Sequence, residues 1–224
     1  MEQAGLWPVI FLGLSGALAQ TSLDEKVFVF PKPSTNSYVK LMPRLLEPLQ
    51  QFTMCLRFYT DLTREFSLIS CASRNKDNEI LLIKYSPTVY HAFVGGTSLA
   101  YTVPGSTYRG SQWENVCMAW NSTTGIIQLW VNGLALPRKG LSKGYAVETD
   151  LFIMLGQEQD SYGGSLDEKQ SFVGEMAGVY MWDTVLPSEQ LRRMGWEKVP
   201  TPLVDWTALN FEIKGYVVLG PTLD

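Results

Sequence analysis

An uninterrupted stretch of the chain reads Val116-Cys-Met-Ala-Trp120, then Asn121-Ser-Thr-Thr-Gly125, then Ile126-Ile-Gln-Leu-Trp-Val131, and Asn132-Gly133 follows it. The two apolar runs are short and rich in β-branched and aromatic residues, which is typical of β-strands. The segments between and after them carry the Asn, Ser, Thr and Gly that favour turns. The stretch therefore predicts a β-hairpin over residues 116–131, followed by a second turn.

The same alternation of short apolar runs and turn residues fills most of the 224-residue chain. Further strand-like runs cover residues 27–30, 52–58, 66–71, 79–85 and 89–94. Short strands at this spacing are typical of a two-sheet sandwich or a jelly roll. Because no linker, low-complexity tract or internal repeat divides the chain, we expect an all-β fold that forms one domain over residues 20–224.

One short helix is expected over residues 187–195. Pro187 and Glu189 stand at its start, Arg192 and Arg193 stand near its end, and Gly195 follows the last periodic residue. This order matches the polarity of a helix, which favours acids at the first turn and bases at the last.

The first nineteen residues are typical of a secretory signal peptide. The apolar run from Leu6 to Leu14 is too short to span a bilayer, and Ala17-Leu-Ala19 supplies the small residues of a cleavage site. The segment before the run is atypical, because it carries Glu2 and no Lys or Arg. A buried apolar strand or helix is the alternative. We expect residues 1–19 to be removed and the mature protein to be secreted and extracellular.

The composition argues against nucleic-acid binding and against catalysis. The chain has 22 Asp and Glu residues against 18 Lys and Arg, and no basic cluster suited to a phosphate backbone. The single histidine, His91, lies in a strand-like run. A Ser–His hydrolase or a histidine-ligated zinc site needs a constellation that the chain lacks. We therefore expect no catalytic residues and no enzyme activity.

Three cysteines leave one without an intramolecular partner if the other two pair. Cys55 and Cys117 lie in strand-like runs that two neighbouring central strands would bring within bridging distance. Such a bridge stabilises the fold by about 4 kcal/mol in the chain-entropy model. Cys71 would then be free and buried, with an intermolecular bridge as the alternative.

The stretch Leu155-Gly-Gln-Glu-Gln-Asp-Ser-Tyr-Gly-Gly-Ser-Leu-Asp-Glu-Lys-Gln170 is rich in side-chain oxygens and bent by paired glycines. Its candidate ligands are three carboxylates and two amides: Glu158, Asp160, Asp167, Gln159 and Gln170. Oxygen-rich loops of this kind suit Ca²⁺, which takes about six to eight oxygen ligands. A calcium ion held on a surface can in turn hold an anionic ligand.

A second oxygen-bearing turn contains Asp77 and Asn78, just before a strand-like run. An EF-hand is excluded, because counting from Asp160 puts Tyr162 and Gly164 at its third and fifth positions. Calcium would therefore be held by a site built from loops. The plain alternative for each acidic turn is a solvated loop without a metal.

Glu158 and Asp160 would face one side of a strand, as the paired carboxylates of jelly-roll glycosidases do. The next position on that face is Tyr162, and Gly163-Gly164 interrupts the strand. A glycosidase is therefore not expected.

Asn121-Ser-Thr123 is an N-glycosylation sequon placed in the predicted hairpin turn. Secretion would allow its modification, and an unmodified sequon is the alternative.

Cys117-Met-Ala-Trp120, with Ser122 two residues further on, resembles the short-pentraxin signature His-x-Cys-x-Ser/Thr-Trp-x-Ser/Thr. Asn115 and Ala119 depart from that signature. The resemblance extends over residues 20–224 and is nearer to serum amyloid P component than to C-reactive protein, with a mucosal pentraxin as a further candidate. Further matching segments are Val27-Phe-Val-Phe-Pro31, Asp77-Asn-Glu-Ile-Leu81, Leu155 to Gly164, Met181-Trp-Asp183 and Asp205-Trp206.

The resemblance implies a flattened, lectin-like jelly roll with a calcium face, an opposite face that carries the helix, and a homopentameric ring. It implies a disulfide between Cys55 and Cys117. It places one ion on Asp77, Asn78, Glu158, Asp160 and the backbone carbonyl of Gln159. It places a second ion on Glu158, Asp160, Asp167 and Gln170.

The resemblance also implies a shallow ligand pocket formed by Leu81, Ile83 and Phe93 beside the metals. Phe93 would fill the notch that accepts choline in C-reactive protein, and Ser98 carries no charge for the cation. We therefore expect weak phosphocholine discrimination and a better fit to phosphoethanolamine, phosphorylated sugars or a cyclic carboxylate acetal. Ordinary strand packing is the alternative role for these three residues.

Together these features predict a secreted, calcium-dependent pattern-recognition protein of innate immunity and the acute phase. It would bind phosphate- or carboxylate-bearing groups on microbial or damaged-cell surfaces through two Ca²⁺ per protomer, with avidity from the ring. Complement or receptors are candidate partners of the opposite face. The alternative is a jelly-roll lectin that binds unphosphorylated glycans and uses calcium only structurally.

Overall fold

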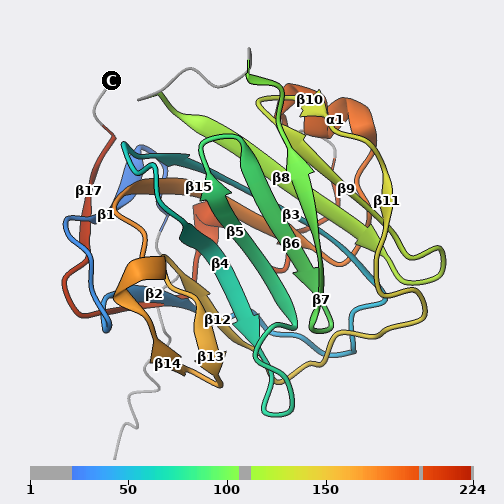
Figure 1. Ribbon diagram of the computed structural model, residues 1–224, viewed down its shortest axis with the longest axis horizontal. Coiled ribbons are helices and arrows are strands. Elements are labelled where there is room, and N and C mark those ends of the chain that lie inside the picture. The colour runs from blue at the N-terminus through green and yellow to red at the C-terminus, as the bar shows by residue number, and fades with distance from the viewer. Residues whose placement is uncertain (1–21, 106–111, 197–198, 223–224) are drawn as a thin grey trace, which may run out of the picture.

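The computed structural model describes residues 22–105, 112–196 and 199–222, and its ribbon is a sandwich of two large antiparallel sheets (Figure 1). The predicted signal peptide lies outside the described residues. The prediction of an all-β fold with one short α-helix is confirmed. The strand runs predicted from sequence are all strands in the structure, with ends that differ by one or two residues.

The first sheet has eight strands and ends at β10 on one side and β17 on the other. Its order is β10 (Leu134–Ala135), β9 (Ile126–Val131), β8 (Glu114–Asn121), β3 (Gln51–Tyr59), β15 (Gly174–Trp182), β1 (Lys26–Phe30) and β17 (Val218–Pro221), with β11 (Lys139–Gly140) also paired to β9. The hairpin predicted over residues 116–131 is β8 and β9, in which Trp120 pairs with Ile127.

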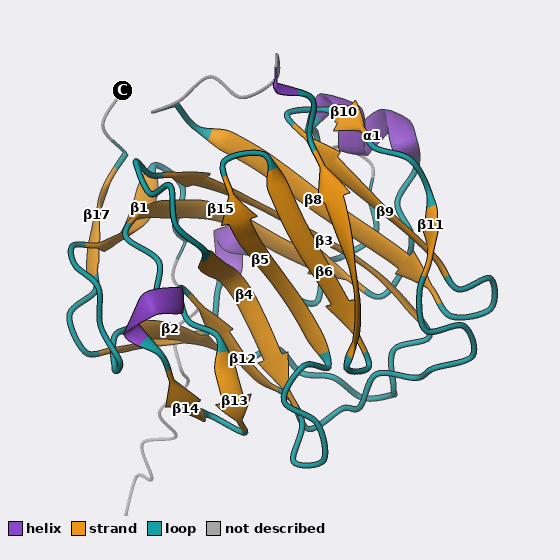
Figure 2. Cartoon of the chain, in the orientation of Figure 1, coloured by secondary structure: helices purple, strands orange, loops and turns teal. Residues whose placement is uncertain are grey.

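The second sheet has seven strands, and a separate hairpin lies beside it. Its order is β16 (Phe211–Lys214), β2 (Tyr38–Leu41), β12 (Phe152–Leu155), β4 (Phe66–Ala72), β5 (Ile80–Ser86), β6 (Val89–Val94) and β7 (Thr97–Thr102). The hairpin pairs β13 (Gln159–Ser161) only with β14 (Gly164–Leu166). Figure 2 shows this small hairpin at one end of the second sheet, apart from the strands of both large sheets.

The core lies between the two sheets and follows the two-residue period of the strands. On β3 and β8, the inward positions Phe52, Met54, Met118 and Trp120 are at most 1 % exposed. Their neighbours Cys55 and Cys117 point to the opposite face, where they belong to a second apolar cluster. Each strand of this pair is therefore buried on both faces.

One inward position of β5 carries a charge. Lys84 lies 2.5 Å from Glu114 of the facing sheet, and the hydroxyl of Tyr90 donates to the same carboxylate. Burial lowers the pKa of Lys84, and the Glu114 carboxylate opposes that effect. The predicted strand over residues 79–85 is therefore not apolar throughout; it carries a polar bridge between the sheets.

The outer face of the first sheet carries the disulfide and the helix. Cys55 and Cys117 are paired directly across β3 and β8, and their sulfurs are bonded at 2.03 Å, as predicted. Cys71 is free and fully buried, also as predicted. α1 (Ser188–Arg193) packs on this face through Leu191, beside Trp130 and Trp182.

The predicted helix end at Gly195 is wrong by one residue. Met194 takes the left-handed conformation with φ of 51° and ends α1, while the N–H of Gly195 donates to the carbonyl of Gln190. The described residues also contain the short 3-10 helices η2 (Glu168–Gln170) and η3 (Trp206–Ala208).

Candidate functional site

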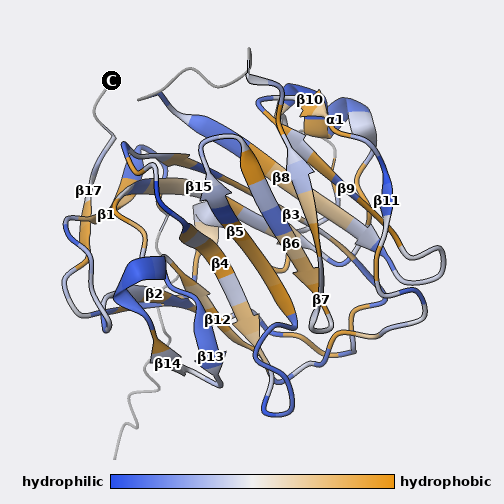
Figure 3. Cartoon of the chain, in the orientation of Figure 1, coloured by the Kyte–Doolittle hydropathy of each residue, from blue (hydrophilic) through white to orange (hydrophobic). Residues whose placement is uncertain are grey.

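The oxygen-rich stretch over residues 155–170 forms the β13–β14 hairpin and η2. Gly156 begins it with φ of +81°, and a Cβ there would lie 2.4 Å from a ring carbon of Phe30, so only glycine fits. Gly163 takes φ of +73° in the turn between β13 and β14. The predicted interruption of the strand at Gly163-Gly164 is therefore confirmed. Figure 3 shows the hydrophilic character of η2 and of the turn between β4 and β5.

Gln159 ties this hairpin to the outer face of the second sheet. Its Nε2 donates to the carbonyls of Ser70 (3.0 Å) and Phe152 (2.9 Å), and its Oε1 accepts from the N–H of Gly163 at 2.8 Å. The side chain is fully buried and already used by these bonds. Only its backbone carbonyl remains as a candidate metal ligand, which is the role that the resemblance implied.

Asp167 and Gln170 lie at the two ends of η2. Asp167 is exposed and caps the helix, because its Oδ1 accepts from the N–H of Lys169 at 2.9 Å. Arg64 fixes this segment by donating from Nη1 to the carbonyls of Lys169 and Ser171, each at 2.8 Å. The same nitrogen also donates to the carbonyl of its neighbour Glu65.

Asp77 and Asn78 occupy the turn between β4 and β5, as predicted. Asp77 Oδ1 accepts from the N–H of Asn78 at 3.0 Å, and the Asn78 carbonyl accepts from the N–H of Gly96 at 2.8 Å. Asn78 Oδ1 is buried and finds no hydrogen-bond donor in the part of the chain that the structure describes. The turn is thus held by backbone bonds while one amide oxygen lacks a partner.

Glu158 is the most unusual acid of the stretch. It is 4 % exposed, and its Oε2 has no hydrogen-bond donor among the described residues. Burial, together with the like charges of nearby carboxylates, raises the pKa of Glu158 to about 7. In decreasing order of effect, those carboxylates are Asp160, Asp77, Glu65 and Asp167. Carboxylates from three separate segments therefore act on one buried acid.

The described residues contain no group of three or more His, Cys, Asp or Glu side chains close enough together to hold an ion. The structure therefore brings Asp77, Asp160 and Asp167 within electrostatic reach of Glu158 without closing them into one cluster. The unpartnered oxygens of Glu158 and Asn78 are pure acceptors, and a buried acceptor without a donor is costly. Both atoms fit a hard cation such as Ca²⁺, which binds oxygen.

The three predicted pocket residues share the outer face of the second sheet. Leu81 pairs with Phe93 across β5 and β6, and Phe93 pairs with Ser98 across β6 and β7. Leu81 and Ile83 are only 2 % and 1 % exposed, so they pack beneath the surface, whereas Phe93 is half-buried. Phe93 is thus the one member whose side chain is open to a ligand.

Two residues near this face were missed by the sequence analysis. Tyr85 is exposed and stacks on His91, with ring centroids 4.1 Å apart. Burial raises the pKa of Tyr85, and the carboxylates of Glu65 and Glu158 raise it further. Extending the β4–β5 register, in which Phe66 pairs with Lys84, sets Glu65 opposite Tyr85. Same-face spacing from Ile83 could have indicated Tyr85, but no sequence signal indicated Glu65.

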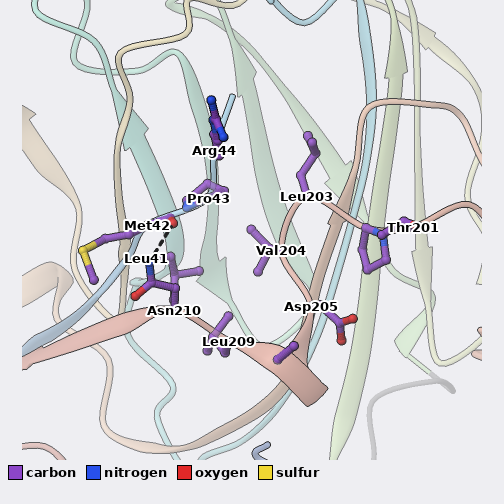
Figure 4. Close-up of a pocket in the computed structure, with 12 residues that line it drawn as sticks. Leu41, Met42, Pro43, Arg44, Thr201, Leu203, Val204, Asp205, Leu209 and Asn210 are labelled. Carbon is purple, nitrogen blue, oxygen red and sulfur yellow. Dashed lines mark hydrogen bonds between the residues drawn. The ribbon is translucent and has the colours of Figure 1, made fainter. Parts of the chain in front are cut away.

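A cavity of about 490 Å³ lies away from these acids, between the segment after β2 and residues 201–210 (Figure 4). Leu41, Val204 and Leu209 contribute apolar side chains to it. Its one carboxylate, Asp205, already accepts from the N–H and hydroxyl of Thr207. This cavity therefore has no donor set for a metal.

Comparison with known proteins gives one family and several full-length relatives. A model of the pentaxin family matches residues 26–221. The chain is 46 % identical to the serum amyloid P-component of Rattus norvegicus, over all of this chain and 97 % of the relative. It is 44 % identical to the mucosal pentraxin of Mus musculus, over 96 % of each chain.

The fold has a solved counterpart as well. The crystal structure of a native heptameric SAP-like pentraxin from Limulus polyphemus matches with a TM-score of 0.80 at 23 % identity, over 90 % of this chain and 97 % of that one. At this identity the match concerns the fold. Within the described residues, no helix is long and apolar enough to cross a membrane.

Proposed function

Because the chain belongs to the pentaxin family, we propose that it is a secreted, calcium-dependent pattern-recognition protein. It binds phosphate- or carboxylate-bearing groups on microbial or damaged-cell surfaces through two Ca²⁺ per protomer. It acts by recognition and carries no catalytic residues.

The observation that supports the proposal is the buried Oε2 of Glu158, which lies among other acids and has no donor within the described ranges. With Asp77, Asp160 and Asp167 it supplies four negative charges, which two Ca²⁺ would balance. The filled site is then formally neutral and retains open coordination positions for an anionic ligand. Asn78, Gln170 and the carbonyl of Gln159 complete the proposed ligand set.

The surface beside the metals favours ligands without a bulky cationic head group. Leu81 and Ile83 pack beneath this surface, and Phe93, opposite Ser98, is its exposed apolar member. Phosphoethanolamine, phosphorylated sugars or a cyclic carboxylate acetal fit this surface better than phosphocholine does.

A pentameric ring would multiply a modest affinity on a repetitive surface. The eight-stranded sheet ends in β10 and β11 on one side and in β17 on the other, and Figure 1 shows these edges on opposite sides of the protomer. Leu134 of β10 and Val218 of β17 are 42 % and 44 % exposed. Unlike edges on opposite sides suit the head-to-tail contacts from which rings close.

The test is calorimetry with Ca²⁺ on the purified mature protein, followed by binding to immobilised phosphoethanolamine with and without EDTA. We expect heat of calcium binding and ligand retention that EDTA abolishes. No heat with calcium contradicts the proposal. Retention on unphosphorylated glycan that survives EDTA would instead favour a lectin whose calcium is structural.

A further inference from the structure

A groove of about 430 Å³ lies on the outer face of the eight-stranded sheet, the face that carries α1. Two rows of the β8–β9 ladder contribute to it, in which Ala119 pairs with Gln128 and Asn121 pairs with Ile126. Val185, in the segment before α1, contributes as well. The groove is therefore built on other strands than those that flank the proposed calcium loops.

The groove is amphipathic. Ile126 and Val185 are 39 % and 40 % exposed, so two large aliphatic side chains stand open to solvent. Gln128 and Arg138 supply polar groups, and Arg138 Nε donates to Gln128 Oε1 at 3.3 Å. Apolar surface combined with a few convergent polar groups is typical of a ligand site.

One donor in the groove lining lacks an acceptor. Trp130 is 2 % exposed, and its indole N–H has no hydrogen-bond partner among the described residues. Buried indole donors are usually satisfied, so the environment of this ring is unusual and should report on what lies in the groove. Trp130 sits one row from Gln128 on the same face of β9.

Asn121 of the predicted sequon lines the same groove. Its Nδ2 donates to Gln51 Oε1 at 3.0 Å, and its Oδ1 accepts from the N–H of Thr124 at 3.2 Å. A side-chain amide nitrogen carries two hydrogens, and only one is used here. Replacing the second hydrogen by a sugar carbon leaves both hydrogen bonds intact, so the folded conformation of Asn121 is compatible with a glycan.

We propose that Asn121 carries an N-linked glycan whose first N-acetylglucosamine lies in this groove, against Ile126 and Val185. In the modification, Nδ2 bonds to C1 of an oligosaccharide delivered as a lipid diphosphate. The C1–oxygen bond breaks, the lipid diphosphate leaves with the bonding pair, and the amide loses one proton to a base. The inference rests on the secretion part of the proposed function and not on calcium.

The apolar and the polar groups of the sugar both find matching groups in the groove. The C–H face of the ring would cover the exposed aliphatic surface of Ile126 and Val185. The acetamido and hydroxyl groups supply acceptors for Gln128 and Arg138. A glycan held here is ordered by the protein, whereas a glycan on a flat surface is not.

The first test is occupancy after secretion from mammalian cells, measured by intact mass before and after an amidase that removes N-glycans. We expect the parent and Thr123→Ser to carry the glycan, because both keep the sequon, and Thr123→Ala to lack it. An unmodified parent overturns the proposal.

The second test concerns the groove. In the native protein the glycan must leave the groove before the amidase can cleave it. We therefore expect the native parent to be cleaved about tenfold more slowly than the unfolded parent. In an Ile126→Ser/Val185→Ser variant, the ratio of the unfolded to the native cleavage rate should be smaller. Both replaced side chains are exposed, so the variant should fold. The Trp130 indole resonance should also differ between Thr123→Ser and Thr123→Ala. Equal ratios and an unchanged resonance overturn the groove assignment. Calcium titration of each variant tests the proposed function separately.

Discussion

Glu158→Gln should have opposite effects on stability and on function. In the metal-free protein the buried carboxyl has a pKa of about 7 against an ordinary value of 4.5. A raised acid pKa penalises the folded state when the group is ionised, so the penalty is absent below pH 4.5, grows between pH 4.5 and 7, and is complete above pH 7. A pKa difference of one corresponds to about 1.36 kcal/mol, so the difference of about 2.5 lowers the free energy of unfolding by about 3 kcal/mol.

The amide variant removes this penalty because it is neutral at every pH. In EDTA at pH 8, we expect Glu158→Gln to raise the free energy of unfolding by up to about 3 kcal/mol, and by well under 1 kcal/mol at pH 4. Urea unfolding of parent and variant at both pH values measures the difference. Glu168→Gln is the matched control, because Glu168 is exposed, and it should change stability by about 0.5 kcal/mol at most.

Calcium should reverse the order of the two proteins. At about one hundred times its dissociation constant, the ion stabilises the parent by about 2.7 kcal/mol for each site. Glu158→Gln loses the carboxylate proposed to bridge both ions, so it should gain little from calcium and lose calcium-dependent ligand retention. A variant that is no more stable than the parent in EDTA at pH 8 would refute the reasoning, as would full ligand retention at millimolar calcium.

Three further outcomes are expected. Phe93→Thr combined with Ser98→Glu should raise phosphocholine affinity about fivefold, measured by calorimetry in calcium, because it opens a notch and adds a charge for the cation; no gain would show that Phe93 does not exclude choline. Arg64→Gln should lower stability in EDTA by about 2 kcal/mol and weaken the second ion most, because it frees the segment that carries Gln170; unchanged affinity for both ions in a calcium titration speaks against this role. Cys71 should resist thiol reagents until the protein is unfolded, because burial removes access and raises its pKa; modification of the native protein contradicts that.

The sequence predicts strands well and their environment less well. The two-residue period of residues 52–58 and 116–120 identifies β3 and β8, and the placement of Cys55 and Cys117 in central strands allows their pairing. Periodicity does not reveal which charged residue finds a partner across the core. Lys84 therefore reads as an ordinary strand residue until Glu114 of the facing sheet is seen beside it.

The candidate site shows the same division. Composition and glycine placement are enough to predict an oxygen-rich loop near Glu158. They do not predict that Glu158 is buried with its Oε2 unpaired among the described residues, since that depends on how Gln159 attaches the hairpin to β4. Glu65 lies far away in sequence, and only the β4–β5 register and the bonds of Arg64 bring it to the acids.

The β13–β14 hairpin shares no ladder with either large sheet. The buried amide of Gln159 and the side chain of Tyr162, which packs on Phe152 and donates to Asp150, attach it to the rest of the protein. Substitutions at its exposed positions, such as Ser161 and Ser165, should therefore change the free energy of unfolding only slightly. Natural variation can alter the proposed calcium loop while the sandwich beneath it stays unchanged, so the two parts are free to evolve at different rates.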